Sequence, residues 1–486
     1  MSRPLQRTEW VGRALLLGQL AAMLVFSTVQ YRRYGLTNDF AGYAQAWTAI
    51  AHGHLDPSVS VFGVPFLRNN LDLAMYPLAP LAWLYPHPVV LSWAHDAAVV
   101  ATELVALAWA RDVLVEKGAA LGRRRDLVLL AVAVMLAANP WSWETIALPL
   151  HFEPFATLFA VLAARDLWRG RNRRLWLWAP LAMGAEALGS LYVLAVGLAA
   201  VAAGRATRRG GTALVAAGGA GLVAVLRLGL VGRGGTTMAG TYGYLGVGSH
   251  AGAAGLVGGV VTHPAAAAAM LGSHAGYVLG YVIAGGALGL AGPWGAAAVL
   301  LIIVPNALSG QLAFIAFPGA FQSWPAEPFL TVGSVLVLCR LADILRAPES
   351  RRALGAGAVA VLTAALTVAL ADVSSLSRRW VADRHTADQL ALVDRRVPVG
   401  AEVVAPQDLI GRLAVGREAY AYYRRGQHLP IVEAKVVVVL QPGTSPEQVA
   451  AVRRLRHEPG TRTLVSGDRI TALLVHPQLG ERTLTV

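Results

Sequence analysis

The segment RYGLTNDFAGYAQAW, residues 33–47, follows directly on an apolar run that ends near Val29. It crowds an amide, a carboxylate and a glutamine, namely Asn38, Asp39 and Gln45, at the point where a membrane helix has just emerged. A carboxylate held there could take a proton from an attacking hydroxyl group as a general base. It could equally be an ordinary acidic residue in the first turn of an interfacial helix, where the helix dipole favours the ionised form.

The helix that would position Asp39 is predicted over residues 37–53. Thr37 or Asn38 caps it, and Gly53 closes it. Its apolar residues recur at helical spacing and predict one buried face: Phe40, Ala44, Trp47 and Ala51.

Glu186 is a second candidate carboxylate. The stretch 175–203 is too long for one crossing, and basic segments flank it on both sides, RGRNRR before it and RATRR after it. Both ends are therefore expected on the same side of the membrane, and the stretch is predicted to be two short helices that meet near Glu186. A carboxylate at membrane depth is expensive and indicates a function.

His151 and Glu153 lie in the apolar stretch ETIALPLHFEPFATLFAVLAA, predicted as a span over residues 145–164. Glu144 and His151 are seven residues apart and would share a helix face, whereas Glu153 would point elsewhere. Two prolines in the stretch favour a functional interruption of the helix. The alternative is that His151 is a histidine of the helix core with its hydrogen bonds satisfied.

Several arginines lie on the side that the positive-inside rule leaves poor in cations. Arg32, Arg33 and Arg233 stand at predicted outer span ends, and Arg227 lies about one turn inside a span. Cations there suit an anionic lipid headgroup such as a phosphate or diphosphate. Long cationic side chains that reach ordinary phospholipid are the alternative.

One chemistry uses all of these groups: glycosyl transfer from a polyprenyl-phosphate sugar to an extracytoplasmic acceptor. Asp39 would be the base, negative charge would support an oxocarbenium-like transition state, and the arginines would hold the leaving phosphate. A lipid-linked sugar flippase or transporter is the first alternative, although no internal repeat is found. A non-catalytic protein of cell-envelope assembly is the second.

Two predicted outer loops hold further candidates. GRGGTTMAGTYGYLGVGSHAGAAG is long and rich in glycine, as functional lids or disordered loops are. Its Tyr242 and Tyr244 could stack on a sugar, or they could anchor the loop at the interface. In AFQSWPAEPF, Trp324 and Glu327 could rim an acceptor site or belong to an interfacial belt.

The composition places these residues in a polytopic membrane protein. The 486 residues are 56% hydrophobic and only 14% charged, with a mean hydropathy of +0.52. The net charge of +13 fits arginine-rich cytoplasmic loops, and no basic stretch interleaved with aromatic residues predicts nucleic-acid binding. Cys339 is the single cysteine, so disulfides and thiolate metal sites are excluded.

Eleven transmembrane segments are predicted on the pattern of a GT-C-like fold, counting the stretch 175–203 as two. The others are 11–30, 88–110, 126–140, 145–164, 211–231, 266–290, 292–305, 329–345 and 353–373.

Charge gives the predicted orientation. With the N-terminus in the cytoplasm, the inner loops hold 17 Lys and Arg residues and the outer loops hold four. An odd number of spans then puts residues 374–486 outside, beside the loop 31–87 that carries Asp39. The transmembrane domain is thus predicted over residues 1–373.

The tail, residues 374–486, is predicted to be a small extracytoplasmic α/β domain. EVVA, AKVVVVL and RTLVSG…ITALLVH have the alternating or continuous apolar character of strands. SPEQVAAVRRLRHE is typical of an amphipathic helix with a Ser cap.

The chain also resembles an uncharacterised family of predicted bacterial membrane proteins, a domain of unknown function grouped with the C-type glycosyltransferase (GT-C) superfamily. The matching stretches run from about residue 35 to 425. They are NDFAGYAQAWTAIAHG, LDLAMYPLAPLAWLYP, LPLHFEPFATLFAVLAA, TYGYLGVGSH, LIIVPNALS and VPVGAEVVAPQDLIGRLAVGREAYAY.

The resemblance implies a plasma-membrane enzyme in which Asp39 takes the place of the acidic residue in the first loop of the superfamily. His151 and Glu153 take the place of a His and an acidic residue in a later span. Asn38, Tyr43 and Gln45 surround Asp39 as substrate-binding residues. Two features of the superfamily are missing. Its frequent Asp-x-Asp motif has no counterpart near Asp39, and GAEALGS around Glu186 lacks the family's acidic pair. A divalent cation is therefore a possible cofactor that the resemblance does not require.

Overall fold

The computed structural model describes most of the chain. The described residues are 3–69, 71–148, 150–227, 239–248, 252–317, 319–345, 366, 370, 372, 376, 381–422, 428–431, 433–441, 446–476 and 483–485.

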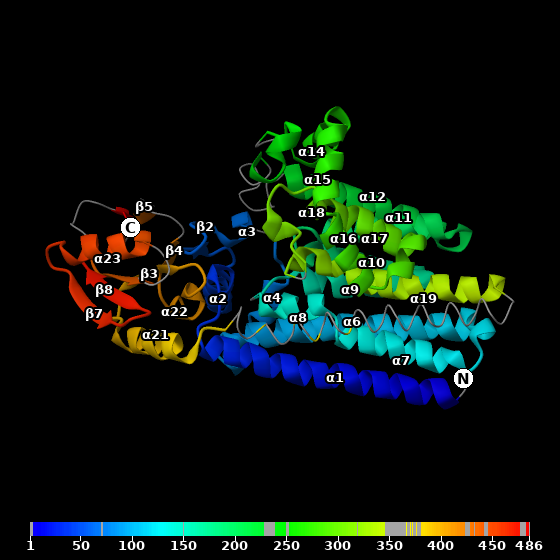
Figure 1. Cartoon of the computed structure of the whole chain (residues 1–486), viewed down its shortest axis with the longest axis horizontal. Coiled ribbons are helices and arrows are strands. Elements are labelled where there is room, and N and C mark those ends of the chain that lie inside the picture. The colour runs from blue at the N-terminus through cyan, green and yellow to red at the C-terminus, as the bar shows by residue number, and fades with distance from the viewer. Residues whose placement is uncertain are drawn as a thin grey trace.

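A helical bundle makes up the larger part of the molecule, and the C-terminal domain lies beyond one end of it (Figure 1). The bundle helices are α1 (Arg3–Arg32), α6 (Val89–Lys117), α7 (Arg124–Ala137), α8 (Pro140–Ala147), α9 (Glu153–Trp168), α10 (Leu175–Ala185), α11 (Gly189–Ala203), α12 (Arg205–Arg227), α14 (Gly252–Thr262), α15 (Pro264–Ser273), α16 (Ala275–Ala284), α17 (Pro293–Ala298), α18 (Val304–Ala307) and α19 (Glu327–Ile344). Short 3-10 helices are η1 (Ala119–Leu121), η2 (Asn172–Arg174), η3 (Gly243–Leu245), η4 (Ala287–Ala291), η6 (Leu312–Phe314) and η7 (Phe321–Ala326), and a π-helical turn covers η5 (Val299–Ile303).

The prediction of eleven complete spans is wrong. In the described residues, two helical stretches are long and apolar enough to cross a membrane, Leu5–Arg32 and Arg124–Ala147. A third is possible if Ala254–Thr262 and Pro264–Ser273, which meet at 98°, act together. The predicted segments are mostly helical, but several are interrupted or short: α9 has 16 residues, which is roughly 24 Å of helix against about 30 Å of hydrocarbon.

Two boundaries of predicted spans differ from those of the observed helices. The predicted spans 126–140 and 145–164 are separated at residues 141–144. In the structure those residues belong to α8, and the main break comes later, between α8 and α9. The predicted span 266–290 divides at His274, between α15 and α16. The last predicted span, 353–373, falls almost wholly outside the described residues.

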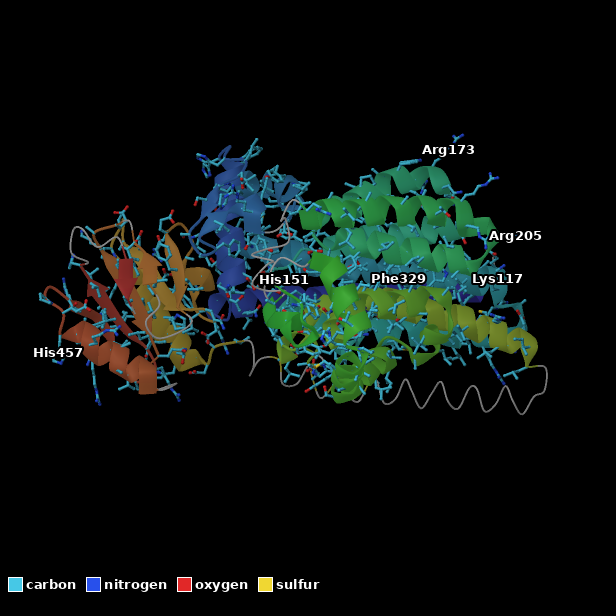
Figure 2. All side chains as sticks on the ribbon, turned by 90° about the horizontal axis from the view of Figure 1, so that it is seen from above. Lys117, His151, Arg173, Arg205, Phe329 and His457 are labelled. Carbon is cyan, nitrogen blue, oxygen red and sulfur yellow. The ribbon has the colours of Figure 1, made fainter. Side chains whose placement is uncertain are left out.

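The hairpin of α10 and α11 was predicted correctly. The two helices meet around Glu186, and Gly189 opens α11 at a point where a side chain would overlap the carbonyl oxygen of Ala182. Arg173 and Arg205, which flank the hairpin, lie with Lys117 at the end of the bundle farthest from the C-terminal domain (Figure 2). These three basic residues, which belong to predicted inner loops, therefore lie at one end of the bundle.

The segment between α1 and α6 forms small elements around α2 (Asn38–Ala51). The others are β1 (Ser58–Val59), β2 (Val64–Pro65), α3 (Phe66–Asn69), α4 (Met75–Leu78) and α5 (Leu81–Leu84). A backbone hydrogen bond from Leu73 N to Gly184 O, 3.0 Å, attaches this segment to the end of α10.

The C-terminal region contains a sheet, as predicted. Its elements are α21 (Arg384–Arg396), β3 (Glu402–Pro406), α22 (Ile410–Leu413), β4 (Ala419–Tyr422), β5 (His428–Pro430), β6 (Val436–Leu440), α23 (Pro446–Arg456), β7 (Arg462–Ser466), β8 (Thr471–Val475) and β9 (Thr483–Thr485). The five-stranded sheet has the order β4-β3-β6-β8-β7, with β3 parallel to β4 and β6, and β8 antiparallel to β6 and β7. Strands β5 and β9 pair separately.

One face of the sheet shares a hydrophobic core with α2. Phe40 and Trp47 of α2 belong to the same buried cluster as Val403 and Val437 of the sheet. Gly411 of α22 approaches Leu36 so closely that only glycine fits, and its N–H donates to Leu36 O at 3.0 Å. The loop that carries Asp39 and the C-terminal domain are therefore packed together as one body.

Candidate functional site

Asp39 lies in the first turn of α2, where the sequence predicts it. The apolar stripe of α2 is buried, and Gly53 adopts a φ of 94° just after the helix ends, as a C-terminal glycine does. Thr37 is the N-cap residue, but its side chain makes no capping hydrogen bond. The Asp39 carboxylate accepts a 3.3 Å hydrogen bond from Asn38 Nδ2.

Glu153 reaches the same place because the chain breaks between α8 and α9. Leu150 in this break has a φ of 38°, which is a strained conformation for a leucine with a fully buried side chain. The break makes Glu153 the first residue of α9. It also ends the expectation that Glu144 and His151 share a helix face, since no continuous helix joins them.

Glu186 stands at the turn of the α10–α11 hairpin. Its backbone is extended, and its carboxylate accepts a 2.7 Å hydrogen bond from Leu188 N. The side chain is buried, with an exposed fraction of 7%.

A fourth carboxylate, Asp72, was missed by the sequence reasoning. It is buried next to α2 and accepts a 2.8 Å hydrogen bond from the Tyr43 hydroxyl. The signal was present, because Asp72 is the lone charge in the apolar stretch LDLAMYPLAPLAWL. A single carboxylate in an apolar stretch indicates a functional residue here as it does at Glu186.

These four carboxylates form one group, which we call the acidic cluster: Asp39, Asp72, Glu153 and Glu186. Glu153 lies close enough to Asp72 and Asp39 to interact electrostatically with both. Glu186 interacts in the same way with Glu153 and Asp72. Four segments far apart in the sequence therefore bring their carboxylates to one place.

Three members of the acidic cluster have no ordinary ion pair with the residues that the structure describes. Within the described part of the chain, Asp39, Glu153 and Glu186 form no salt bridge with lysine or arginine. Tyr192 of α11 is within electrostatic reach of Glu186 and Glu153, and its buried hydroxyl makes no hydrogen bond to any described residue. A buried polar group of this kind is costly unless a ligand completes its bonding.

Asp39 is the member most accessible from water, because its side chain is only partly buried. Removal from water penalises the charged form and raises the pKa of Asp39 to about 6. A carboxylate with such a pKa is still mostly ionised at neutral pH and is a stronger base than an ordinary aspartate.

The possible divalent cation finds no ligand set among the residues with a described placement. No group of three or more His, Cys, Asp or Glu side chains there is arranged to hold a metal ion.

The residues expected to bind substrate around Asp39 are used mainly in packing. Tyr43 is buried and holds Asp72. Gln45 donates from Nε2 to Ser60 Oγ at 2.9 Å and to Arg417 O at 2.8 Å, so it ties α2 to the C-terminal domain. Asn38 donates its backbone N–H to Gln407 O, also in that domain.

A cationic edge lies where α1 ends, next to Tyr31, whose ring centre is 6.0 Å from that of Phe40 in α2. Arg32 is exposed, and Arg412 of α22 donates a 3.2 Å hydrogen bond to Arg32 O. The Arg412 guanidinium lies 4.5 Å from the ring centre of Tyr34. Burial, and then the charges of Arg412 and Arg32, lower the pKa of His87. Arg412 was not predicted, because its place depends on the packing of α22 against α2 and Leu36.

The other predicted site residues are spread more widely. Arg33 is exposed at the end of α1, and Arg227 is exposed at the end of α12. Arg233 lies outside the described residues. His151 stacks on Phe321 with ring centres 3.7 Å apart. Figure 2 shows His151 where the bundle meets the C-terminal body.

The two outer-loop candidates have contacts that differ from those expected of a substrate site. The hydroxyls of Tyr242 and Tyr244 donate to the carbonyl oxygens of Pro305 and Leu308, at 3.0 and 2.7 Å, which fits the anchoring alternative. Glu327 is not at a loop rim. It is fully buried in the bundle, where Asn139 Nδ2 donates to its Oε1 at 3.4 Å.

A helical bundle with long apolar helices, basic residues at one end and an α/β domain at the other defines a membrane protein. The family described as "Predicted membrane protein (DUF2079)" matches residues 34–459, and the chain belongs to that family. No curated protein and no solved structure is significantly similar to the chain.

Proposed function

We propose that the protein is a membrane-embedded glycosyltransferase of the GT-C type, which moves a sugar from a polyprenyl-phosphate donor to an acceptor outside the cytoplasm. The observation that carries the proposal is the acidic cluster. Three predicted catalytic carboxylates, Asp39, Glu153 and Glu186, meet there from separate parts of the chain.

Asp39 is assigned as the base. It is the carboxylate of the cluster closest to water, and its pKa of about 6 keeps it ionised at neutral pH while making it a competent proton acceptor. The acceptor hydroxyl would give its proton to Asp39 as its oxygen attacks the anomeric carbon of the sugar.

The deeper carboxylates are assigned to the transition state. As the bond to the leaving phosphate breaks, positive charge develops on the sugar ring, and nearby negative charge stabilises it. Glu153, Glu186 and Asp72 share protons, because like charges this close cannot all ionise. The negative charge that the group keeps lies in a buried setting, where electrostatic interactions are strong. The lone Tyr192 hydroxyl could donate to a sugar oxygen.

The cationic edge is assigned to the donor. The leaving group is a phosphate, and it needs cations rather than a general acid. Arg32 and Arg412 lie where α1 ends, and Tyr31 beside them packs edge-on against Phe40, the residue after Asp39. A lipid phosphate at this edge would keep its chain in the membrane and its sugar next to the acidic cluster.

The test is sugar transfer by the purified full-length protein from a radiolabelled polyprenyl-phosphate sugar. Asp39→Asn is expected to lower the rate about 10²- to 10⁴-fold, which is the usual contribution of a general base. Asp39→Ala should behave alike, and both variants should still bind the lipid donor. Asp388→Asn removes an exposed carboxylate of α21 and serves as the matched control with wild-type activity.

Full activity of Asp39→Asn would refute the base assignment. Transfer by Arg412→Gln at the wild-type rate and with wild-type donor affinity would refute the assignment of the cationic edge.

A lipid-linked sugar flippase is the second candidate, and one observation favours it. Transporters often place two interrupted helices in corresponding halves. Besides the hairpin at Glu186, the structure contains the bent pair Ala254–Thr262 and Pro264–Ser273. Movement of the sugar lipid across liposomes without transfer to any acceptor would select this function.

A further inference from the structure

A groove on the outside of the bundle lies far from the acidic cluster. Its apolar wall is formed by Ala14 and Leu17 of α1 and by Leu104 and Ala108 of α6, and it encloses about 420 Å³. Leu17 is exposed in an apolar helix that is long enough to cross the membrane, so the groove faces the region where lipid chains lie.

Two arginines stand at the polar end of this groove, Arg13 of α1 and Arg165 of α9. Arg13 and Arg32 are separated by 19 residues of continuous helix, roughly 28 Å, which is close to the thickness of the hydrocarbon core. When Arg32 lies at one membrane interface, Arg13 therefore lies at the other. The groove belongs to the leaflet opposite the acidic cluster.

The arginines are part of a larger charged group, which we call the arginine cluster: Arg13, Arg111, Arg165 and Arg169 with Glu9 and Asp112. Arg165 and Arg169 bind the two oxygens of Asp112 at 2.9 and 2.6 Å. Arg111 bridges Asp112 and Glu9, and Arg13 pairs with Glu9 at 2.6 Å.

Four positive charges thus share two negative ones, and an excess of two positive charges remains. Glu9 and Asp112 are buried, whereas the Arg13 side chain is 41% exposed and those of Arg111, Arg165 and Arg169 are 20–24% exposed. The carboxylates fix the guanidinium groups from the inside, and the outer N–H groups are left for an anion. Guanidinium groups held in this way are good phosphate donors.

We infer that this groove binds one anionic glycerophospholipid. Its phosphate sits against Arg13 and Arg165, and one acyl chain lies along the wall of Leu17, Leu104 and Ala108. Basic pockets between helices at a membrane interface recognise anionic headgroups in this way. The lipid is distinct from the proposed sugar donor, because it occupies the other leaflet.

The experiment measures lipid binding to the purified, delipidated full-length protein by native mass spectrometry. Phosphatidylglycerol is expected to bind with 1:1 stoichiometry and more tightly than phosphatidylcholine. Arg13→Gln should lower the affinity for phosphatidylglycerol about fivefold and leave the affinity for phosphatidylcholine unchanged. Arg111 stays paired with Glu9 in this variant, so the fold is retained.

Two further variants sharpen the test. Arg7→Gln removes an exposed arginine on the same helix outside the groove and should not change binding. Ala14→Phe fills the groove without changing its charge and should also lower the affinity for phosphatidylglycerol.

Equal binding of the two lipids would overturn the proposal. So would equal effects of Arg13→Gln and Arg7→Gln, which would indicate adsorption to the general positive surface. Competition by millimolar inorganic phosphate as effective as that by the lipid would indicate a free-phosphate site instead.

Discussion

The two ends of the bundle treat buried carboxylates in opposite ways. At the arginine cluster, Glu9 and Asp112 are surrounded by guanidinium groups within 2.6–2.9 Å. At the acidic cluster, Glu153 and Glu186 face other carboxylates. These four carboxylates are buried to a similar degree, with exposed fractions of 5–7%.

This difference distinguishes buried carboxylates that stabilise the fold from buried carboxylates that serve a function. A carboxylate removed from water costs free energy, and a close guanidinium offsets that cost. The arginine cluster is balanced in this way and stabilises the meeting of α1, α6 and α9. Among the described residues, Asp39, Glu153 and Glu186 of the acidic cluster have no such pair, which is typical of a site that a ligand or a reaction completes.

The largest expected effect comes from Glu186→Gln and Glu153→Gln. Under the proposed function each should lower sugar transfer by about 10²-fold or more, since charge near the transition state is lost. Neither should lower the unfolding temperature, because a neutral amide in place of a buried carboxyl group relieves repulsion within the acidic cluster. Loss of activity together with loss of stability would place these residues in the structural class instead.

At the other end, Asp112→Asn should do the reverse. This substitution removes the carboxylate that the guanidinium groups of Arg111, Arg165 and Arg169 share. We expect a loss of about 3 kcal/mol in the free energy of unfolding. Glu116→Gln on the same helix removes an exposed pair with Lys117 and should change stability by less than about 0.5 kcal/mol. Denaturant unfolding in detergent compares the two, and equal small effects would contradict the structural role.

The raised pKa of Asp39 predicts that the difference in stability between the wild type and Asp39→Asn depends on pH. Its pKa is raised in the folded protein, so the folded state binds more protons and stability falls as pH rises from about 4 to about 6. Asp39→Asn should therefore be more stable than wild type by about 2 kcal/mol at pH 8 and equal to it at pH 4. Thermal unfolding across this range measures it. Parallel curves would contradict the burial of Asp39.

The rate of sugar transfer should also depend on pH in this range. Because the base must be ionised, activity of the wild type should decline as pH falls through about 6. A profile without a decline near this pH would argue against Asp39 as the base.

The smallest effect is expected for Tyr43→Phe. It removes one hydrogen bond to Asp72 and should cost about 1 kcal/mol of stability. The transfer rate should fall only a few-fold, since Tyr43 positions a carboxylate and does not touch substrate. A loss as large as that of Asp39→Asn would make Tyr43 a direct participant.

Features with local signals were predictable from the sequence. The helix around Asp39 follows from its apolar spacing and Gly53, and the hairpin at Glu186 follows from basic segments on both flanks. Strand β6 follows from a run of four valines, and strand β8 follows from a short continuous apolar run.

Features that depend on distant contacts were not predictable. Leu150 interrupts a strongly apolar stretch with a positive φ that only tertiary packing can hold. Arg412 reaches Arg32 from 380 residues away, and Asn139 donates to the buried Glu327 from 188 residues away. The count of spans failed for a related reason, because interrupted helices have the composition of complete ones.

The most direct measurement is the accessibility of the body that carries Asp39. Leu55→Cys lies near the end of α2 with 69% of its side chain exposed, Arg173→Cys lies at the basic end of the bundle, and the native Cys339 is buried. A membrane-impermeant maleimide should label Leu55→Cys in intact cells, and it should label Arg173→Cys only after permeabilisation. Labelling in the reverse order would put the acidic cluster in the cytoplasm and contradict the account.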